Sequence, residues 1–241
     1  VLYLTLGFRQ FSHHFSEIRN ALDEGNDALA REKLAAWLRV DASSLPRSEL
    51  LRQVIEHSVL SAHRHVFGVL VCFVVFWALG LGPAGAVFYR SAEYLSRNWR
   101  ARADGTPSVA LRHAAATAWR WIDHVPARVT ALGFAVVGNF EEAVASWRTD
   151  AERFAAGSDG VVLAATAGAI NVRLGGEALK ARTELHAPQG LEIDADMGDS
   201  DSTPGREPEV GHLRSVVGLV WRSVVVWMLL LALLTLARLL G

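Results

Sequence analysis

The sequence predicts an all-α integral membrane protein with short, re-entrant membrane helices and a cytosolic helical hairpin. Two observations lead to this fold class, and a third concerns possible partners. Hydrophobic residues make up 51% of the 241 residues while 20% are charged, which indicates a body partly in lipid and partly in water. Two long apolar runs occur, at 66–88 and 215–237, and segments with helical periodicity lie around them. The net charge of −1 gives no indication of nucleic acid as a partner.

The N-terminal part predicts helices that face water. Residues 1–8 resemble the end of an apolar helix, so we expect a fragment that lacks N-terminal membrane segments. Apolar residues recur at steps of three and four over 8–22, a second short helix is expected over 27–38, and Pro46 opens a third. We therefore assign 9–65 to a cytosolic helical region.

The first apolar run, 66–88, is long enough to cross a bilayer but is expected to turn back. Glycines and a proline cluster within 80–85, where a straight helix would have to continue. Arginines flank both ends, among them Arg64 and Arg97, and cytoplasmic loops collect such residues. The pattern predicts a re-entrant hairpin with both ends on the cytoplasmic side. The single cysteine, Cys72, excludes an intramolecular disulfide.

A proline-centred stretch over 121–132 organises the middle of the chain. Pro126 suits the first position of a helix, and Asp123 just before it would then favour the helix N-terminus. Arg128, one turn further, would lie at the depth of the lipid headgroups. The simplest interpretation is a capped helix that enters the membrane, with a snorkelling arginine.

The rest of the chain is expected to complete a membrane-associated core over 66–184. A polar helix is expected over 140–154, and a helix of small residues that ends at Gly175 and Gly176. A flexible acidic loop should occupy 185–211. The C-terminal segment, 212–241, is predicted to be a transmembrane helix, and its Arg222 should face the bundle interior or snorkel.

Several segments, in this order, resemble the CobD/CbiB family of integral membrane proteins of cobalamin biosynthesis. The stretch Phe76-Trp77-Ala78-Leu79-Gly80, with Tyr89-Arg90 after it, follows a family pattern, and Val125 to Leu132 is nearly the family's VPARLTAL. The other segments that carry the resemblance are Leu22–Arg31, Arg39–Asp41, Ala164–Gly176 and Arg214–Leu231.

The resemblance implies an ATP-dependent, amide-forming ligase. It would join aminopropanol or its phosphate to a propionate carboxylate of a corrinoid, with ATP and Mg²⁺ as cofactors, and would need no cofactor if inactive. The implied substrate-binding residues are Arg90, Arg128, Arg173, Gly175 and Gly176, and the candidate catalytic acids are Asp41 and Asp123. No resident metal site is predicted.

The resemblance also implies a location and partners. We expect a multi-pass protein of the bacterial inner membrane whose main polar face is cytoplasmic. Its partners would be the lipid bilayer, the corrinoid and aminopropanol phosphate, and a further membrane protein is an open alternative.

The chain departs from the family pattern at three places. The acidic motif expected before Phe76-Trp77 is missing at that spacing, Glu93-Tyr94-Leu95-Ser96 replaces Asn-Thr-Leu-Asp, and Ser158-Asp159-Gly160 replaces Ser-Pro-Asn. These departures keep two further interpretations open. One is a non-catalytic sensor similar to AmpE, a membrane protein linked to β-lactamase regulation, and the other is a structural membrane protein without a ligand.

Overall fold

The computed structural model describes residues 8–38, 41–101, 109–154, 157–176 and 202–240, and every regular element in these ranges is a helix. The all-α prediction is therefore confirmed for this part of the chain. In chain order the elements are α2 (Phe8–Asp23), α3 (Asp27–Leu38), α4 (Arg47–Ala62), a π-helix η1 (His63–Phe67), α5 (Gly68–Ala78), α6 (Ala84–Ala101), α7 (Val109–Val137), α8 (Phe140–Asp150), a short 3-10 helix η2 (Ala151–Arg153), α9 (Ser158–Ile170) and α11 (Val210–Leu240).

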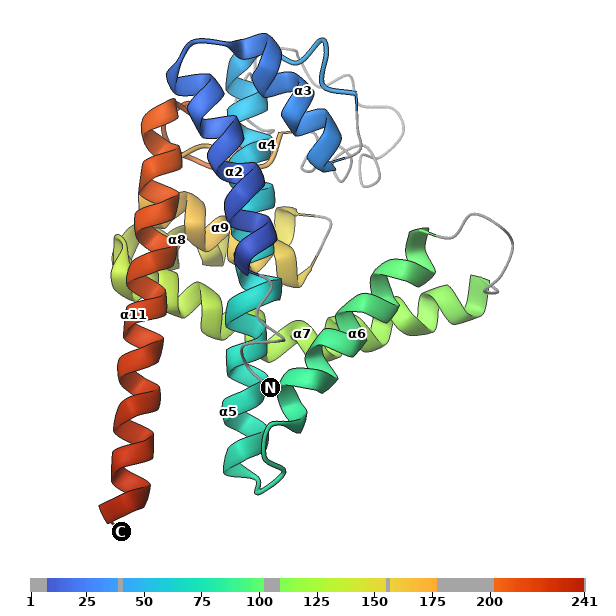
Figure 1. The fold of residues 1–241 in the computed structure, drawn as a ribbon, viewed down its shortest axis with the longest axis vertical. Coiled ribbons are helices and arrows are strands. Elements are labelled where there is room, and N and C mark those ends of the chain that lie inside the picture. The colour runs from blue at the N-terminus through green and yellow to red at the C-terminus, as the bar shows by residue number, and fades with distance from the viewer. Residues whose placement is uncertain (1–7, 39–40, 102–108, 155–156, 177–201, 241) are drawn as a thin grey trace.

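The helices follow two main directions (Figure 1). α4, α5 and α11 run along the long axis of the molecule, with α2 and α3 at one end, while α7 runs across them. At the other end, the turn between α5 and α6 and the C-terminal part of α11 both extend past α7. α6 and the first half of α7 form an arm that projects from the body.

α4, η1 and α5 form one continuous helix, Arg47–Ala78, of 32 residues. This helix and Val210–Ala237 are the two in the described residues that are long and apolar enough to cross a membrane. Within the most apolar window of each, 56% of the first is buried inside the protein but only 22% of the second. The first is therefore also a core helix, and it passes without a break through the expected boundary at residue 65.

α5 and α6 form the hairpin that the glycine cluster predicts. The turn between them contains Gly80 and Gly82 with φ of 78° and 62°, a backbone conformation that other residues rarely adopt. A Cβ on Gly85 would collide with the carbonyl oxygen of Cys72 and with Phe76, so this glycine allows the two helices to pack closely.

α7 differs from the sequence prediction, because Pro126 lies inside a helix of 29 residues and not at its start. The ring removes the amide that would donate to the carbonyl four residues earlier, which costs roughly 3 kcal/mol in a helix interior. Tertiary packing offsets this cost: Ala127, Ala131 and Phe134 are fully buried in the main core. Asp123 is therefore a buried residue in mid-helix and not an N-terminal cap.

α9 ends earlier than predicted, at Ile170, because Asn171 adopts the left-handed conformation (φ 52°) and closes the helix. Gly175 and Gly176 follow in the segment after the helix, with φ of 117° and 41°. Isolated β-bridges join this segment to the far end of the predicted acidic loop, Val172 to Arg206 and Gly175 to Ser202. That end of the loop is therefore held in place, while 185–201 lies outside the described residues.

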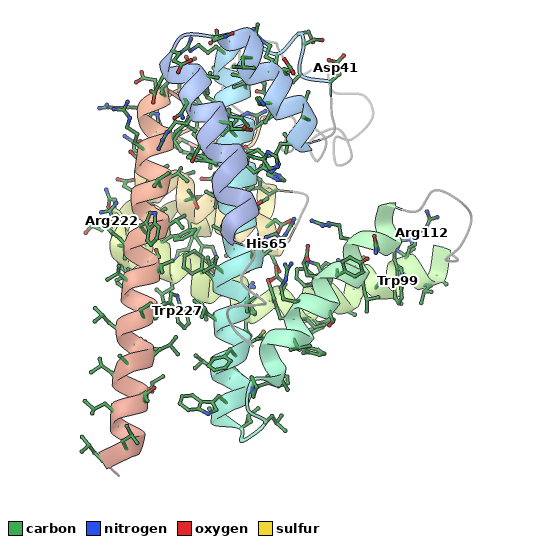
Figure 2. All side chains as sticks on the ribbon, in the orientation of Figure 1. Asp41, His65, Trp99, Arg112, Arg222 and Trp227 are labelled. Carbon is green, nitrogen blue, oxygen red and sulfur yellow. The ribbon has the colours of Figure 1, made fainter. Side chains whose placement is uncertain are left out.

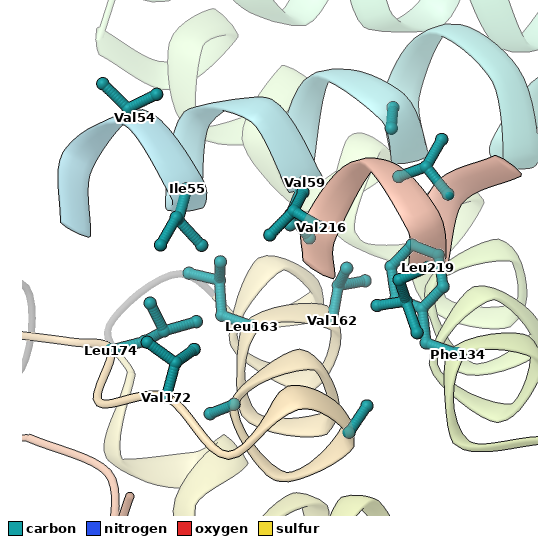
Figure 3. Packing of buried hydrophobic residues seen from close by; sticks show 14 of the residues in the cluster. Val54, Ile55, Val59, Phe134, Val162, Leu163, Val172, Leu174, Val216 and Leu219 are labelled. Carbon is teal, nitrogen blue, oxygen red and sulfur yellow. The ribbon is translucent and has the colours of Figure 1, made fainter. Parts of the chain in front are cut away.

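The main hydrophobic core lies where α4, α9 and α11 meet α7 (Figure 3). α9 contributes mostly small side chains, and a Cβ on Gly168 would meet the backbone of Glu142 in α8. The prediction that small residues in this segment allow close helix approach is thus confirmed. The larger apolar residues of this core include Val54, Ile55, Val59, Phe134, Val162, Leu163, Val172, Leu174, Val216 and Leu219.

Arg222 does not face the bundle interior. Its side chain is exposed on the outer surface of α11 (Figure 2), and its Nε donates to the carbonyl oxygen of Gly218 at 3.1 Å. The interior alternative for this residue was wrong. The reason is geometric, since Leu219, Val220 and Ser223 occupy the buried face of the helix at this level.

Candidate functional site

Asp123 is the centre of a buried polar group that joins three helices. Its Oδ1 accepts from the Tyr89 hydroxyl of α6 at 2.6 Å and lies 3.0 Å from His63 Nε2 in η1. His63 Nδ1 lies 2.9 Å from Thr130 Oγ1, one helical turn beyond Pro126. All four side chains are buried, so these contacts have little competition from water.

The hydrogen bonds constrain where the protons lie. The Thr130 hydroxyl donates to the carbonyl oxygen of Pro126 at 2.9 Å, so its oxygen is left to accept from His63 Nδ1–H. His63 Nε2 and Asp123 Oδ1 then need one further proton between them, held by either atom. In both arrangements the pair is neutral overall, which keeps the desolvation cost of a buried carboxylate low.

The π-helix and a glycine make this contact possible. π-helical turns within longer α-helices occur often at functional sites, because the extra residue turns side chains out of the regular register. His63 is the first residue of η1 and points inward, while Arg64 and His65 are half exposed. A Cβ on Gly68 would collide with the ring and hydroxyl of Tyr89, so only glycine lets Tyr89 reach Asp123 here.

Charged side chains lie near this buried group, since Arg64 is within electrostatic range of Asp123, Glu93 and Asp159. Arg64 Nη2 lies 2.5 Å from Asp159 Oδ2 in the first turn of α9. Glu93 of α6 is buried and lies 3.3 Å from Arg90 Nη1 and 3.7 Å from Arg97 Nη1. We call the whole set the junction site; it consists of His63, Arg64, Tyr89, Arg90, Glu93, Arg97, Asp123, Thr130 and Asp159.

Tyr89 provides a protonated hydroxyl to this site. Burial and the neighbouring Asp123 carboxylate raise the pKa of Tyr89 well above its ordinary value. The phenol therefore stays a donor to Asp123 at all physiological pH values.

Three polar atoms of the junction site are buried and have no hydrogen-bond partner in the described structure. They are Asp123 Oδ2, Asp159 Oδ1 and Arg64 Nε. Ser58 Oγ is the remaining such side-chain atom in the described part of the chain. Unpaired buried polar atoms are costly, and their concentration in one place is typical of a site that receives water or a ligand.

The structure brings some of the predicted site residues together and separates others. Asp123 and Arg90 belong to the junction site. Arg128 lies on another face of α7, where its Nη1 donates to the carbonyl oxygen of His124 at 3.1 Å. Asp41 is exposed in the loop after α3 (Figure 2), where its Oδ1 accepts from the amide and hydroxyl of Ser43. These bonds lower the pKa of Asp41.

Arg173, Gly175 and Gly176 lie in the segment after α9 and form their contacts there. Arg173 Nε donates to the carbonyl oxygen of Gly205 at 2.8 Å. The amide of Gly175 donates to Glu56 Oε1 at 2.7 Å, and a Cβ on Gly176 would collide with the guanidinium of Arg52. The contacts of this segment thus hold it to α4 and to the end of the loop.

Sequence reasoning did not select most residues of the junction site. In the sequence, Arg64 stands out only as one of the arginines that flank the first apolar run, and His63 has no pattern that marks it. Glu93 and Asp159, however, stand at two of the three places where the sequence departs from the CobD/CbiB pattern. The two positions belong to one site in the folded protein, and the linear sequence could not reveal this.

The family model and the similar curated proteins point to the same family. The family model described as CobD/Cbib protein matches residues 1–201. A protein of Stutzerimonas stutzeri named Cobalamin biosynthesis protein CobD is 32% identical over 231 residues, which cover 96% of this chain and 70% of the relative. A protein of the same name from Chromobacterium violaceum is 35% identical over 181 residues, 74% of this chain and 55% of the relative.

A third relative of that name, from Mycobacterium tuberculosis, is 37% identical over 134 residues, which cover 54% of this chain and 34% of the relative. The chain thus spans 70% of one of these relatives, about half of the next and a third of the last. No solved structure matches it. The relatives found give no support to the AmpE-like alternative.

Proposed function

Because this chain belongs to the CobD/Cbib family, we propose that it acts in cobalamin biosynthesis and that the junction site is where it handles its substrates. The reaction class follows from the family resemblance: amide formation between an amino alcohol, or its phosphate, and a propionate carboxylate of a corrinoid. The observation that carries the assignment to this site is the cluster of unpaired buried atoms on Arg64, Asp123 and Asp159.

The side chains of the junction site suit both reactants. Asp123 Oδ2 and Asp159 Oδ1 are unpaired acceptors, and a protonated amine offers donors to carboxylate oxygens. Arg64, Arg90 and Arg97 are cations, and arginine binds carboxylates and phosphates in a bidentate manner. The amine must lose a proton before it forms an amide, and the His63–Asp123 pair is the group here that could accept one.

ATP and Mg²⁺ belong to this proposal as cofactors. When bound, Mg·ATP would supply the activation of the propionate carboxylate. No group of three or more His, Cys, Asp or Glu side chains in the described residues could hold a metal ion. Mg²⁺ that arrives with ATP usually needs only one or two protein carboxylates in addition to the phosphates. One of the two unpaired oxygens, on Asp123 or Asp159, would meet that requirement while the other accepts from the amine.

A second candidate function is a family member that binds the corrinoid but has lost turnover. The ion pairs of the junction site favour it. Arg64 already pairs with Asp159, and Glu93 lies between Arg90 and Arg97, so these charges partly neutralise one another without a substrate. Both places coincide with departures from the family pattern.

The location follows the same proposal. We place the protein in the bacterial inner membrane, with the α2–α3 end in the cytoplasm, where ATP and the soluble precursors are. The two apolar helices support membrane association, and the arginines at both ends of the α5–α6 hairpin support a cytoplasmic location for those ends.

Complementation tests the proposed function. The full-length gene should restore growth of a strain that cannot form the cobinamide amide bond. Asp123→Asn and Arg64→Gln should abolish the rescue, while Arg214→Gln, which removes only an exposed pair with Asp23, should preserve it. Membrane levels of each variant are measured by immunoblot to exclude loss of the protein.

The two candidates predict different results. Rescue by the wild type and not by the site variants supports the ligase. No rescue, together with saturable corrinoid binding that Arg64→Gln weakens, supports the second candidate. If the wild type shows neither rescue nor binding, both are wrong.

A further inference from the structure

α7 carries an apolar stripe that no described part of the chain covers. Trp121 is 77% exposed, Val125 55%, Leu132 47% and Val136 60%. Their spacing of four, seven and four residues places them on one face of the helix. Arg128 falls between them at helical spacing, and it is the only charged residue of the stripe.

The opposite face of α7 packs against the rest of the protein. It buries Asp123 in the junction site, and Ala127, Ala131 and Phe134 in the main core. α9 packs against this face and lies on the α2–α3 side of α7 (Figure 1). The apolar stripe must therefore face the other way, toward the end of the molecule where α11 and the α5–α6 turn extend.

The elements that extend past α7 are themselves apolar and exposed. α11 crosses α7 where Trp227 approaches Gly133 (Figure 2), and beyond that point its exposed residues include Met228, Leu229, Leu233, Leu236 and Leu239.

The α5–α6 turn also exposes apolar side chains, those of Leu79 and Leu81, and the first turns of α6 expose Phe88. The apolar stripe of α7 thus faces the same end of the molecule as the exposed apolar parts of α11 and the α5–α6 turn. A bilayer at that end would surround those two segments.

From these observations we infer that α7 is an interfacial helix that lies flat on the bilayer between the two penetrating elements. Its apolar stripe contacts the upper acyl chains, and Arg128 reaches the lipid phosphates. This inference differs from the expectation that the segment after Pro126 enters the membrane. It also places the junction site, on the upper face of the same helix, at the membrane surface.

Depth measurement by spin labelling tests this geometry. In a Cys72→Ala background, single cysteines replace Val125, Leu132 or Val136 in the full chain, which is reconstituted in vesicles of phosphatidylethanolamine and phosphatidylglycerol. A nitroxide label reports its depth through the ratio of collisions with oxygen and with a water-soluble nickel chelate. Thr149→Cys, on the exposed side of α8, is the water-facing control.

A flat helix predicts that the three stripe labels lie at one shallow depth, within about 5 Å of each other. A helix that enters the membrane predicts a gradient of about 16 Å between 125 and 136, because the rise is about 1.5 Å per residue. Labels at Leu229, Leu233 and Leu236 of α11 should show such a gradient and calibrate the measurement.

Two outcomes would overturn the inference. A gradient along α7 like that along α11 would mean that the helix crosses the membrane. Immobilised spectra with low oxygen access would mean that protein covers the stripe, either a second copy or another chain. Neither result depends on substrate or on catalytic activity, so a failure here leaves the proposed ligase function intact.

Discussion

Asp123 and His63 are separated by sixty residues in the sequence, yet their side chains meet at 3.0 Å with no exposure to solvent. A π-helical turn on one side and a proline-containing helix on the other hold them there. Burying either side chain alone in a charged form would carry a large desolvation cost, whereas together they form a pair that is neutral overall. The junction site is built around this contact.

The His63–Asp123 pair should show strong energetic coupling. Asp123→Ala leaves His63 and Tyr89 without their buried acceptor, so we expect a loss of about 3–5 kcal/mol in the free energy of unfolding. In a double-mutant cycle with His63→Ala, the two losses should fall short of additivity by about 1–3 kcal/mol. The measurement is reversible unfolding in detergent micelles. The exposed pair Arg214–Asp23 is the control and should couple by less than about 1 kcal/mol.

Gly68→Ala should damage the junction site through a steric effect alone. The added methyl group collides with Tyr89 and should destabilise the protein by about 1–3 kcal/mol. Gly133→Ala is the matched control, because the added Cβ would lie 4.0 Å from Trp227 Nε1, an ordinary van der Waals distance. Alanine there should be neutral or stabilise by up to about 1 kcal/mol. Equal thermal midpoints for the two variants would contradict the packing described here.

Thr203 should matter more than its place in an acidic loop suggests. Its buried Oγ1 accepts from the amide of Leu174 at 2.9 Å, so Thr203→Val leaves that amide unpaired. We expect a cost of about 1–3 kcal/mol and faster hydrogen exchange at Leu174. Thr203→Ser keeps the oxygen and should retain the exchange protection; if it behaves like valine, the hydroxyl bond is not the cause.

The α5–α6 hairpin should place both its ends on one side of the membrane. In the Cys72→Ala background, Ser61→Cys and Asn98→Cys should react with an impermeant maleimide in inside-out vesicles and stay unreactive in right-side-out vesicles. The physical reason is that Arg64 and Arg97 both reach the junction site, so neither end can cross the bilayer. Labelling of the two positions from opposite sides would refute the re-entrant arrangement.

Asp41 should be dispensable for the reaction. Asp41 is exposed, and its Oδ1 already accepts hydrogen bonds from the amide and the hydroxyl of Ser43. Because its pKa is lowered in the folded state, its small contribution to the turn is present above the ordinary pKa of aspartate and is lost as the pH falls through the lowered value. Asp41→Asn should complement as well as the wild type, and loss of rescue would place this loop at the active site.

The linear sequence predicted the features that depend on local patterns. The helix over 27–38 has the expected bounds, the turn falls at the glycines after Ala78, and α11 is apolar over most of its length. These features depend on periodicity, backbone freedom and length, which neighbouring residues determine. The family resemblance is of the same kind, because it depends on the order of short motifs.

Where tertiary contacts compete with local preference, the sequence predicted the wrong structure. Pro126 has the local properties of a helix start, but packing on both sides keeps the helix continuous through it. The helix before Gly175 and Gly176 ends early because Asn171 turns the chain toward 202–206. Both the continuity of the helix through Pro126 and the early end of the helix before Gly175 depend on contacts with residues that are distant in the sequence.

By itself, the sequence determined that this chain is helical, partly apolar and a member of its family. Only the tertiary structure decided which polar residues meet, because His63, Tyr89, Asp123 and Asp159 lie on separate helices whose relative positions follow from packing. A buried charge requires a partner nearby in space, and no pattern within one helix can specify that partner.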